Sequence, residues 1–271
     1  MQNLKTPRVR SAANHEPAPG SFRQGSVEAF RLRRVKQKLG NFLIPRLPVT
    51  RHVFNHIRWE LNALWVRLNF VFNPGYIART RRIRAGSELS VNVGCGPFGR
   101  PDWINLDLMA MPNVSLRYDT RKGIPLREGS AARIRCEHFF EHLDRVDEAF
   151  PFLRNCHRSL RVGGTLRIVV PDAGRYLLAY SSPDDEAWHD LGWDLNDLPP
   201  DITSKMDIVN HVFRQGEEHR YAYDAETLIA TLREAGFAHA RQLAFGESSD
   251  PLLRDDRPEH RLYSLYVDAI K

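Results

Sequence analysis

The residues most able to do chemistry in this chain are three glycines and the acid that follows them. Gly94, Gly96 and Gly99 match the G-x-G-x-x-G spacing of turns in which the backbone approaches the phosphates of a dinucleotide. Such a site also needs a helix directly after the glycines and an acid about 20 residues further on. Here Pro97 interrupts the segment, and Asp107 follows Gly99 by only eight residues. The spacing therefore predicts a strand, a turn and a second strand ending in an acid, which suits a nucleoside cofactor without phosphates.

Three further motifs follow the glycine turn in a fixed order. They are Tyr118-Asp119-Thr120, the run CEHFFEHL from Cys136 to Leu143, and the run LRVGGTLRI from Leu160 to Ile168. Together with the turn, they resemble the class I methyltransferases that use S-adenosylmethionine (SAM), in particular the type 11 branch. The chain departs from the family pattern in its short connection after the glycines and in Val162, which stands where the family usually has proline.

The resemblance implies a cofactor site on the first three strands and the fourth. In the family, the glycine loop passes under the methionine part of SAM, the acid that ends the second strand binds the ribose, and an acid after the third strand contacts the adenine. An acid at the end of the fourth strand completes the set. The predicted cofactor-binding residues are therefore Gly94, Cys95, Gly96, Asp107, Asp119 and Glu137.

The candidate catalytic residues are histidines. His138 directly follows the fourth predicted strand, where open parallel sheets bind ligands, and an imidazole titrates near neutral pH. It is a candidate base for an acceptor hydroxyl, or a residue that orders its loop through hydrogen bonds. His211 and His219 lie in the polar run 210–221, which in the resembling enzymes lies over the acceptor; the alternative is a salt-bridged surface turn. Their spacing of eight, without cysteine, favours no metal site.

Alternating strand and helix patterns begin at about residue 88. Strands are predicted at about 89–94, 103–107, 115–119, 132–137, 165–170, 239–245 and 262–268. Helices are expected from about Asp147 to Gly163 and from Asp224 to Gly236, and Asp172 could orient an acceptor or cap the helix that follows it. This pattern predicts an α/β fold with a Rossmann-like, seven-stranded, mostly parallel sheet covered by helices on both faces.

The chain divides into three predicted parts. Residues 1–24 form a disordered basic tail, residues 25–84 a basic helical extension, and residues 85–271 the SAM-dependent methyltransferase domain, with a substrate-cover insertion at about 173–223. Within the extension, apolar residues from Phe54 to Val71 recur at spacings of three and four, which indicates one stripe on a helix that ends near Asn73. We expect this stripe to pack on the domain; the alternatives are a membrane interface or a cover over the substrate pocket.

The charge of the chain is unevenly distributed. Residues 1–84 contain 17 Lys and Arg against 3 Asp and Glu, whereas residues 85–271 contain 22 against 30. The basic extension could therefore bind an anionic membrane or nucleic acid at the periphery of the protein, and a solvated helix face is the alternative. Three cysteines without a framework spacing, a polar N-terminus and the lack of a transmembrane segment favour a cytoplasmic location, and the basic extension adds a membrane-peripheral position as an alternative.

These observations predict an enzyme that transfers a methyl group from SAM to a small-molecule or glycan-precursor acceptor, and they favour oxygen over nitrogen as the acceptor atom. A binding or scaffold protein on the same fold, tethered through residues 1–72, is a second hypothesis. RNA methylation aided by the basic arm is a third. The place after the fourth strand reads Glu137-His138-Phe139-Phe140, where nucleic-acid amino methylation would normally show an Asn/Asp-Pro-Pro-aromatic element.

Overall fold

The structure is a computed structural model that describes residues 50–271. The predicted disordered tail and the extension up to residue 49 lie outside the described residues. One compact unit runs from His56 to Lys271, and the following description concerns that unit. Of the helices that the structure describes, none combines the length and the apolar character that crossing a membrane requires.

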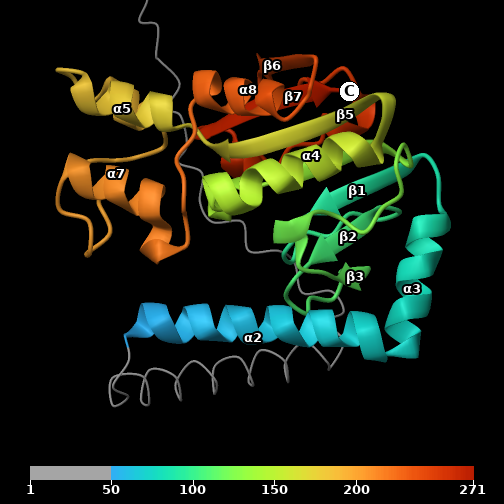
Figure 1. Cartoon of the computed structure of the whole chain (residues 1–271). Helices are drawn as coiled ribbons and strands as arrows, with labels where there is room; N and C mark the ends of the chain where they lie inside the picture. Colours follow the sequence, from blue (N-terminus) through green and yellow to red (C-terminus); the bar gives the residue numbers. More distant parts are fainter. Residues whose placement is uncertain (1–49) are drawn as a thin grey trace, which may run out of the picture. The chain divides into compact units, whose positions relative to one another are not determined.

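Seven strands form a single sheet in the order β3-β2-β1-β4-β5-β7-β6 (Figure 1). The strands are β1 (Leu89–Val93), β2 (Ile104–Asp107), β3 (Leu116–Arg117), β4 (Ala131–Glu137), β5 (Leu160–Pro171), β6 (His239–Leu243) and β7 (Ser264–Ile270). β1 to β5 are parallel to one another, whereas β7 runs antiparallel to both β5 and β6. The predicted seven-stranded, mostly parallel sheet is therefore confirmed.

The central strands present two different faces. Val91, Ile134 and Leu166 are fully buried, lie side by side in the register of β1, β4 and β5, and belong to one apolar cluster with residues of the helices around Leu153 and Leu228. Arg135 and Arg167, which alternate with these residues along β4 and β5, are buried on the other face, where the segment between β6 and β7 contacts the sheet. The order reverses between β1 and β4, so the loops that follow these two strands diverge and leave a crevice at the carboxyl edge of the sheet.

Two of the helices after the central strands begin at an aspartate that caps them. Asp224 accepts a hydrogen bond from the Thr227 amide at 2.8 Å and begins α8 (Ala225–Glu234). Asp172 likewise accepts from the Arg175 amide at 3.3 Å and caps α5 (Ala173–Ser181), which agrees with the capping alternative. Short 3-10 turns occur at Thr120–Lys122, Phe140–His142, Gln215–Glu217, Pro251–Leu253 and Pro258–His260.

The expected helix from Asp147 to Gly163 is shorter than predicted. A π-helical turn (Arg145–Ala149) precedes α4 (Phe150–Ser159), and β5 begins directly afterwards. Leu160 is buried and pairs with Ala131 of β4, so sheet pairing ends the helix three residues before the glycine. Gly163 instead lies within β5, where its φ of 73° suits a residue without a side chain.

The insertion at 173–223 forms a small helical layer with its own apolar cluster. It contains α5, α6 (Glu186–Asp190) and α7 (Lys205–Arg214), and Figure 1 shows α5 and α7 beside one end of the sheet. Trp188 lies at the centre of this cluster and is completely buried, in contact with Tyr176 at a ring separation of 6.3 Å. The cluster lets the insertion hold a fixed shape over the carboxyl edge of the sheet.

Among residues 50–271, two helices precede the sheet, and the sequence pattern indicated only the first of them. α2 (Arg51–Phe72) ends where predicted, and Asn73 then caps α3 (Pro74–Ala85) by accepting a hydrogen bond from the Tyr76 amide at 3.2 Å. Pro74 takes the first position of α3, where a missing amide hydrogen is harmless.

The expectation that the apolar stripe of α2 packs on the domain is wrong. Leu61, Leu64 and Leu68 are 60%, 50% and 46% exposed, whereas Ala63 and Val66 are buried against Leu108. The side that faces the sheet is selected by small residues and by polar contacts, which a count of large apolar residues does not register. The Arg67 guanidinium reaches Asp119, and the Asn62 side chain accepts a hydrogen bond from Arg117 at 3.1 Å.

Candidate active site

Two cavities open at the carboxyl edge of the sheet and meet at His138. The glycine-loop cavity, of about 570 Å³, is lined by Asn92, by Gly94 to Pro101, by Arg135 and Glu137, and by Asp255 to Glu259. The histidine cavity, of about 500 Å³, is lined by residues that include His142, Tyr176, Trp193, His211, His219, His260 and Tyr263. His138 lines both cavities. A ligand in one cavity would therefore lie next to a ligand in the other.

The glycine loop has the strand-turn-strand geometry that the spacing predicted. Gly94 and Gly96 have φ values of 63° and 50°, in the left-handed region that glycine adopts without strain. A side chain on Gly94 would lie 2.5 Å from the Phe139 ring, whereas nothing lies within 4 Å of the corresponding position on Gly96. Gly94 thus permits close packing against the loop after β4, and Gly96 presents its backbone to open space.

Asp107 lies directly against this loop. Its two carboxylate oxygens accept hydrogen bonds from the amides of Gly96 (2.8 Å) and Met109 (2.7 Å). Each oxygen keeps a second lone-pair direction, so the carboxylate could also accept hydrogen bonds from hydroxyl groups of a ligand. Cys95 beside it is buried, and burial together with the charge of Asp107 raises the pKa of its thiol to about 12. The thiol is therefore neutral and packs rather than reacts.

Two asparagines that the sequence analysis missed shape the loop. The Asn92 side chain donates to the Phe98 carbonyl and to Asn105 Oδ1, both at 3.2 Å. Asn105 in turn accepts from the Arg100 amide at 2.9 Å and donates to the Arg100 carbonyl at 2.8 Å. These bonds replace the helix that is absent after β1. A polar residue at the centre of an apolar strand, in both β1 and β2, is the signal that could have identified them.

Asp119 is already engaged by cations. Its carboxylate contacts Arg121 at 2.9 Å and Arg67 at 2.5 Å, and it is 6% exposed. Burial alone would raise the pKa of Asp119, but the two guanidinium groups outweigh that effect and hold the pKa below its usual range. The structure therefore places Asp119 between α2 and the end of β3. Its contact with adenine stays a prediction.

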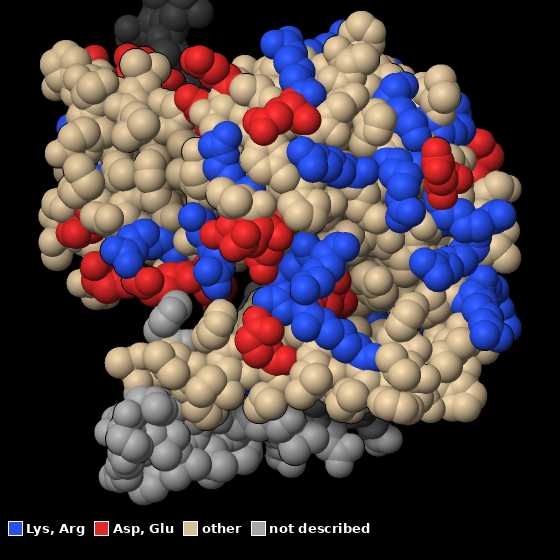
Figure 2. Space-filling view, viewed as in Figure 1, with Lys and Arg blue, Asp and Glu red and all other residues tan. Residues whose placement is uncertain are grey.

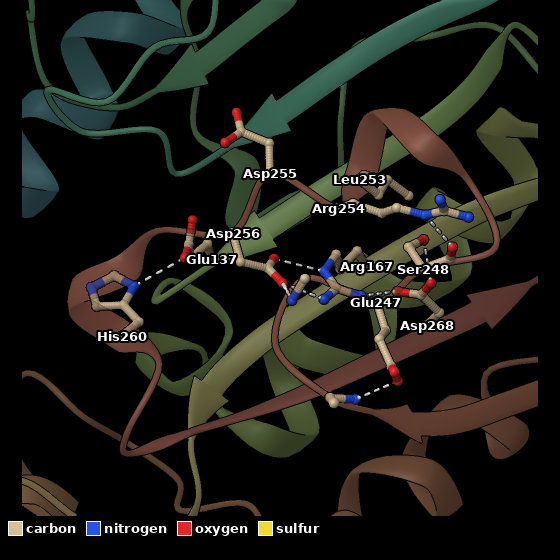
Figure 3. A network of polar contacts seen from close by, with 12 residues as sticks. Glu137, Arg167, Glu247, Ser248, Leu253, Arg254, Asp255, Asp256, His260 and Asp268 are labelled. Atoms are coloured by element: carbon tan, nitrogen blue, oxygen red, sulfur yellow. Dashed lines mark hydrogen bonds and ion pairs between the residues drawn. The ribbon is translucent and has the colours of Figure 1, made fainter.

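Glu137, which lines the glycine-loop cavity, also belongs to a buried ionic network (Figure 3). It accepts two hydrogen bonds from the Arg135 guanidinium, at 2.7 and 3.2 Å, and one from His260 Nδ1 at 3.0 Å. Arg135 also contacts Asp256 at 3.2 Å, and Asp256 forms a two-pronged pair with Arg167. The network thereby attaches the segment between β6 and β7 to the ends of β4 and β5.

The network also determines the surroundings of His138. The His260 ring, held by Glu137, lies against the His138 ring with a centroid separation of 3.9 Å. His138 Nε2 is 2.9 Å from Ser264 Oγ, and its Nδ1 is 3.3 Å from Glu141 Oε1. Its backbone has a φ of 51°, uncommon for a residue with a side chain and typical of functional positions. Both ring nitrogens of His138 thus have a polar neighbour, which fixes the ring at the junction of the cavities.

The structure brings all three candidate catalytic histidines to one cavity. His211 is exposed on α7, at 6.1 Å from the Trp193 ring. His219 is almost buried, because the amides of Arg220 and Tyr221 bond to the Glu141 carbonyl at 2.8 and 3.2 Å and draw this segment under the loop after β4. Glu141 and His142 also line this cavity, and the sequence analysis did not select them as site residues.

The comparisons with known proteins concern the fold. No family model matches the chain, and no curated protein does. Similar solved structures include a SAM-dependent methyltransferase from Thermotoga maritima, described as a possible histamine N-methyltransferase, with 15% identity, coverage of 80% of this chain and 98% of that chain, and a TM-score of 0.42. A SAM-dependent methyltransferase from Archaeoglobus fulgidus is 15% identical, with coverage of 76% of this chain and 99% of that chain and a TM-score of 0.41. The 1,6-didemethyltoxoflavin-N1-methyltransferase of Burkholderia thailandensis, solved with 1,6-didemethyltoxoflavin and S-adenosylhomocysteine, is 13% identical. The match covers 83% of this chain and 92% of that chain, with a TM-score of 0.39.

Proposed function

We propose that this protein is a SAM-dependent methyltransferase that binds SAM along the glycine loop and its acceptor in the histidine cavity. The observation that carries the proposal is the meeting of the two cavities at His138, at the carboxyl edge of a sheet whose order reverses between β1 and β4. In open α/β sheets, ligands bind at this edge and at this reversal.

The glycine loop offers features that suit a nucleoside with a short polar chain. Gly96 exposes its backbone, Asp107 offers carboxylate lone pairs for ribose hydroxyls, and no helix follows β1 to bind phosphates. The amide of Gly96 is held by Asp107, so the loop and the acid are positioned together before a ligand binds. Such positioning lowers the entropy that binding costs.

Methyl transfer requires alignment and, for a hydroxyl acceptor, removal of a proton. SAM supplies a sulfonium-bound methyl group; the bond between the acceptor oxygen and this carbon forms as the sulfur-carbon bond breaks, and the hydroxyl proton passes to a base. His138 lies at the junction where that proton is released, and the Glu141 carboxylate near its Nδ1 would stabilise the imidazolium. A base of this kind favours oxygen over a neutral amine, which already carries a free lone pair.

The lining of the histidine cavity indicates the class of acceptor. Aromatic side chains of Tyr176, Trp193 and Tyr263 alternate there with imidazoles. Aromatic faces pack on apolar faces of sugars and small rings, and imidazoles form hydrogen bonds with hydroxyl groups. We therefore propose a small polyhydroxylated molecule or a glycan precursor as the acceptor.

Calorimetry with SAM and S-adenosylhomocysteine tests the cofactor half of the proposal. Binding of both, with one site per chain, is the expected result, and the absence of heat for either ligand in folded protein would contradict the assignment. Transfer of a labelled methyl group to sugar hydroxyls then separates an enzyme from a scaffold on the same fold, since a scaffold binds without transferring.

Replacing Asp107 by alanine should weaken SAM binding by roughly 1–3 kcal/mol, because the ribose hydrogen bonds to a charged acceptor are lost. Asp147→Ala, which removes an exposed carboxylate outside the loop, should leave the affinity unchanged. Calorimetry measures the affinity, and circular dichroism shows that both variants are folded. Equal affinity in Asp107→Ala and the unaltered protein would mean that another group binds the ribose.

The exposed face of α2 supports a second proposal, that the basic extension contacts an anionic membrane. Leu61, Leu64, Trp65 and Leu68 are exposed along one helix, and α3 beside it has exposed arginines at 79, 81, 82 and 84. Figure 2 shows tan side chains along α2 and blue side chains gathered on the side where α3 lies. Apolar and basic side chains together bind the interface of anionic bilayers.

Vesicle flotation of the full chain tests this contact. Leu64→Glu combined with Leu68→Glu should weaken binding to phosphatidylglycerol vesicles by at least about tenfold, because burying one leucine contributes about 1.5–3 kcal/mol. Leu252→Glu, at an equally exposed leucine elsewhere, should bind as the unaltered protein does. Failure of the full chain to float at low salt, or equal flotation of all three proteins, would contradict the proposal.

A further inference from the structure

Three side chains that are distant in sequence converge on the wall of the histidine cavity. Glu141 and His142 follow β4, and His219 comes from the segment after α7. One potential ligand atom from each residue lies within 4.8 Å of the others. The His142 and His219 rings are in edge-to-face contact at 4.8 Å, and His219 Nε2 is 3.9 Å from Glu141 Oε1.

Backbone carbonyls fix the tautomer of both imidazoles. His219 Nδ1 is 2.6 Å from the Val212 carbonyl oxygen, and His142 Nδ1 is 3.0 Å from the Glu218 carbonyl oxygen. A carbonyl oxygen only accepts, so each Nδ1 must carry the hydrogen and donate it. Each Nε2 then has a free lone pair. Donation of the other ring hydrogen to a carbonyl is the usual second contact of a histidine that binds a metal ion.

The carboxylate of Glu141 is buried among these nitrogens. Its side chain is 2% exposed, and neither oxygen has a hydrogen-bond partner among the described residues. His138 Nδ1, at 3.3 Å from Oε1, is the other close polar atom. His219 Nε2 is also buried without a hydrogen-bond partner among the described residues, and it lies 3.9 Å from Glu141 Oε1. Two electron-rich groups in this arrangement attract a cation.

We propose that Glu141, His142 and His219 bind a divalent first-row transition-metal ion in the wall of the histidine cavity. Two imidazole nitrogens and one carboxylate form a ligand set that Zn²⁺ and Fe²⁺ accept while coordination positions remain open. Ligand atoms around such an ion lie about 3.4 Å apart when the bonds are about 2.0–2.1 Å long, so atoms that now lie within 4.8 Å of one another need to approach by at most about 1.4 Å.

The spacing of histidines along the chain concealed this site. Of the pair considered in the sequence, His219 belongs to the cluster and His211 does not. The hydrogen bonds of the Arg220 and Tyr221 amides to the Glu141 carbonyl bring His219 beside His142 instead. If the acceptor occupies the histidine cavity, as proposed above, the open positions of the ion face it and would bind an acceptor oxygen. This second step rests on the proposed function, whereas the metal site itself does not.

Metal binding is measured directly on full-length protein without a polyhistidine tag. After dialysis against a chelator, the protein is titrated with Co²⁺, followed by visible absorption, and with Zn²⁺, followed by equilibrium dialysis. We expect one ion per chain. His142→Gln and His219→Gln should each weaken binding by at least about 10- to 100-fold, the loss that even outer-shell partners cause. His239→Gln, at an exposed histidine on β6, is the matched control and should bind as the unaltered protein does.

The outcomes separate this inference from the methyltransferase proposal. Loss of Co²⁺ absorption in both histidine variants, with SAM affinity retained, supports the site. Stoichiometric binding that both variants keep, or no binding by the unaltered protein, overturns it whatever the result with SAM. Glu141→Gln is the third variant; should it fail to fold, the two histidine variants decide the question. Protein that binds the ion but not SAM would retain the metal site and refute the proposed function.

Discussion

Replacing Arg167 by leucine will lower the free energy of unfolding by about 3–5 kcal/mol, because it leaves the buried carboxylate of Asp268 without a cation and removes one of the two cations that contact Asp256. Arg167 is completely buried on β5 and binds Asp256 through two hydrogen bonds, at 2.9 and 2.5 Å. It also binds Asp268 of β7 at 2.7 Å (Figure 3). Arg135 still reaches Asp256 in the variant, but the described contacts of Asp268 then reduce to the hydroxyl of Ser248 at 2.6 Å.

Urea unfolding of Arg167→Leu and of a control on the same strand measures this effect. Arg161, also on β5, is 44% exposed and pairs at 3.0 Å with Glu88, which is 67% exposed. Exposed pairs contribute about 0–1 kcal/mol, so Arg161→Leu should change the free energy of unfolding by less than that. Similar small losses in the two variants would show that Asp256 and Asp268 are stabilised by water or by protonation instead of by Arg167.

The same substitution reaches the cofactor region through the segment between β6 and β7. Asp256 belongs to the residues 255–259 that line the glycine-loop cavity, and Arg167 anchors it to the sheet. Loss of the anchor should therefore weaken SAM binding as well as stability. The ionic network fixes the position of the segment between β6 and β7 against the sheet. Its hydrogen bonds are directional, whereas an apolar contact would not fix the position of this segment along the strands.

The strands of this protein could be predicted because burial leaves a simple signal. β4 ends at Glu137, as predicted, β1 ends at Val93, one residue before the predicted end, and Asp107 lies against the glycine turn as its spacing required. The turn itself could be predicted because the prolines after Gly96 leave no room for a helix. Local constraints of this kind are visible in the order of residues.

Contacts between distant segments could not be predicted in this way. Helical spacing on α2 identified an apolar stripe, but Arg67 and Ala63 face the sheet because their partners, Asp119 and Leu108, lie in later strands. Leu160 ends α4 for a similar reason, since its pairing with Ala131 begins β5 before the glycine. The Glu141 cluster depends on a hydrogen bond to a segment about 80 residues further along, which no local pattern encodes.

Acid will remove most of the stability that Glu137 contributes. Burial by itself would raise the pKa of Glu137, but hydrogen bonds from His260 and Arg135 outweigh it and lower the pKa to about 2 from an ordinary 4.5. A carboxyl group with a depressed pKa stabilises the fold above its unfolded pKa and loses that contribution as the pH falls towards the folded value. The shift corresponds to about 3 kcal/mol at neutral pH, and the side chain is only 7% exposed, so solvent screens it little.

Comparison with Glu137→Gln isolates this contribution from the other acids. The advantage of the unaltered protein over the variant, measured by urea unfolding, should shrink by about 2 kcal/mol between pH 7 and pH 3. Glu128→Gln, at an exposed carboxylate, should stay within about 0.5 kcal/mol of the unaltered protein at either pH. A constant difference between Glu137→Gln and the unaltered protein across this range would mean that Glu137 is not the group whose pKa is depressed.

The variant also separates two roles that the sequence and the structure assign to Glu137. If Glu137 binds the cofactor, the Glu137→Gln variant should lose SAM affinity directly at pH 7. If Glu137 instead holds the His260 ring against His138, the variant should keep SAM affinity and lose methyl transfer, since the proposed base would no longer be fixed at the junction of the cavities. The Glu137 side chain is only 7% exposed and is held by two hydrogen bonds from Arg135 and one from His260, which favours the positioning role. We therefore expect Glu137→Gln to reduce the rate of transfer more than the affinity for SAM.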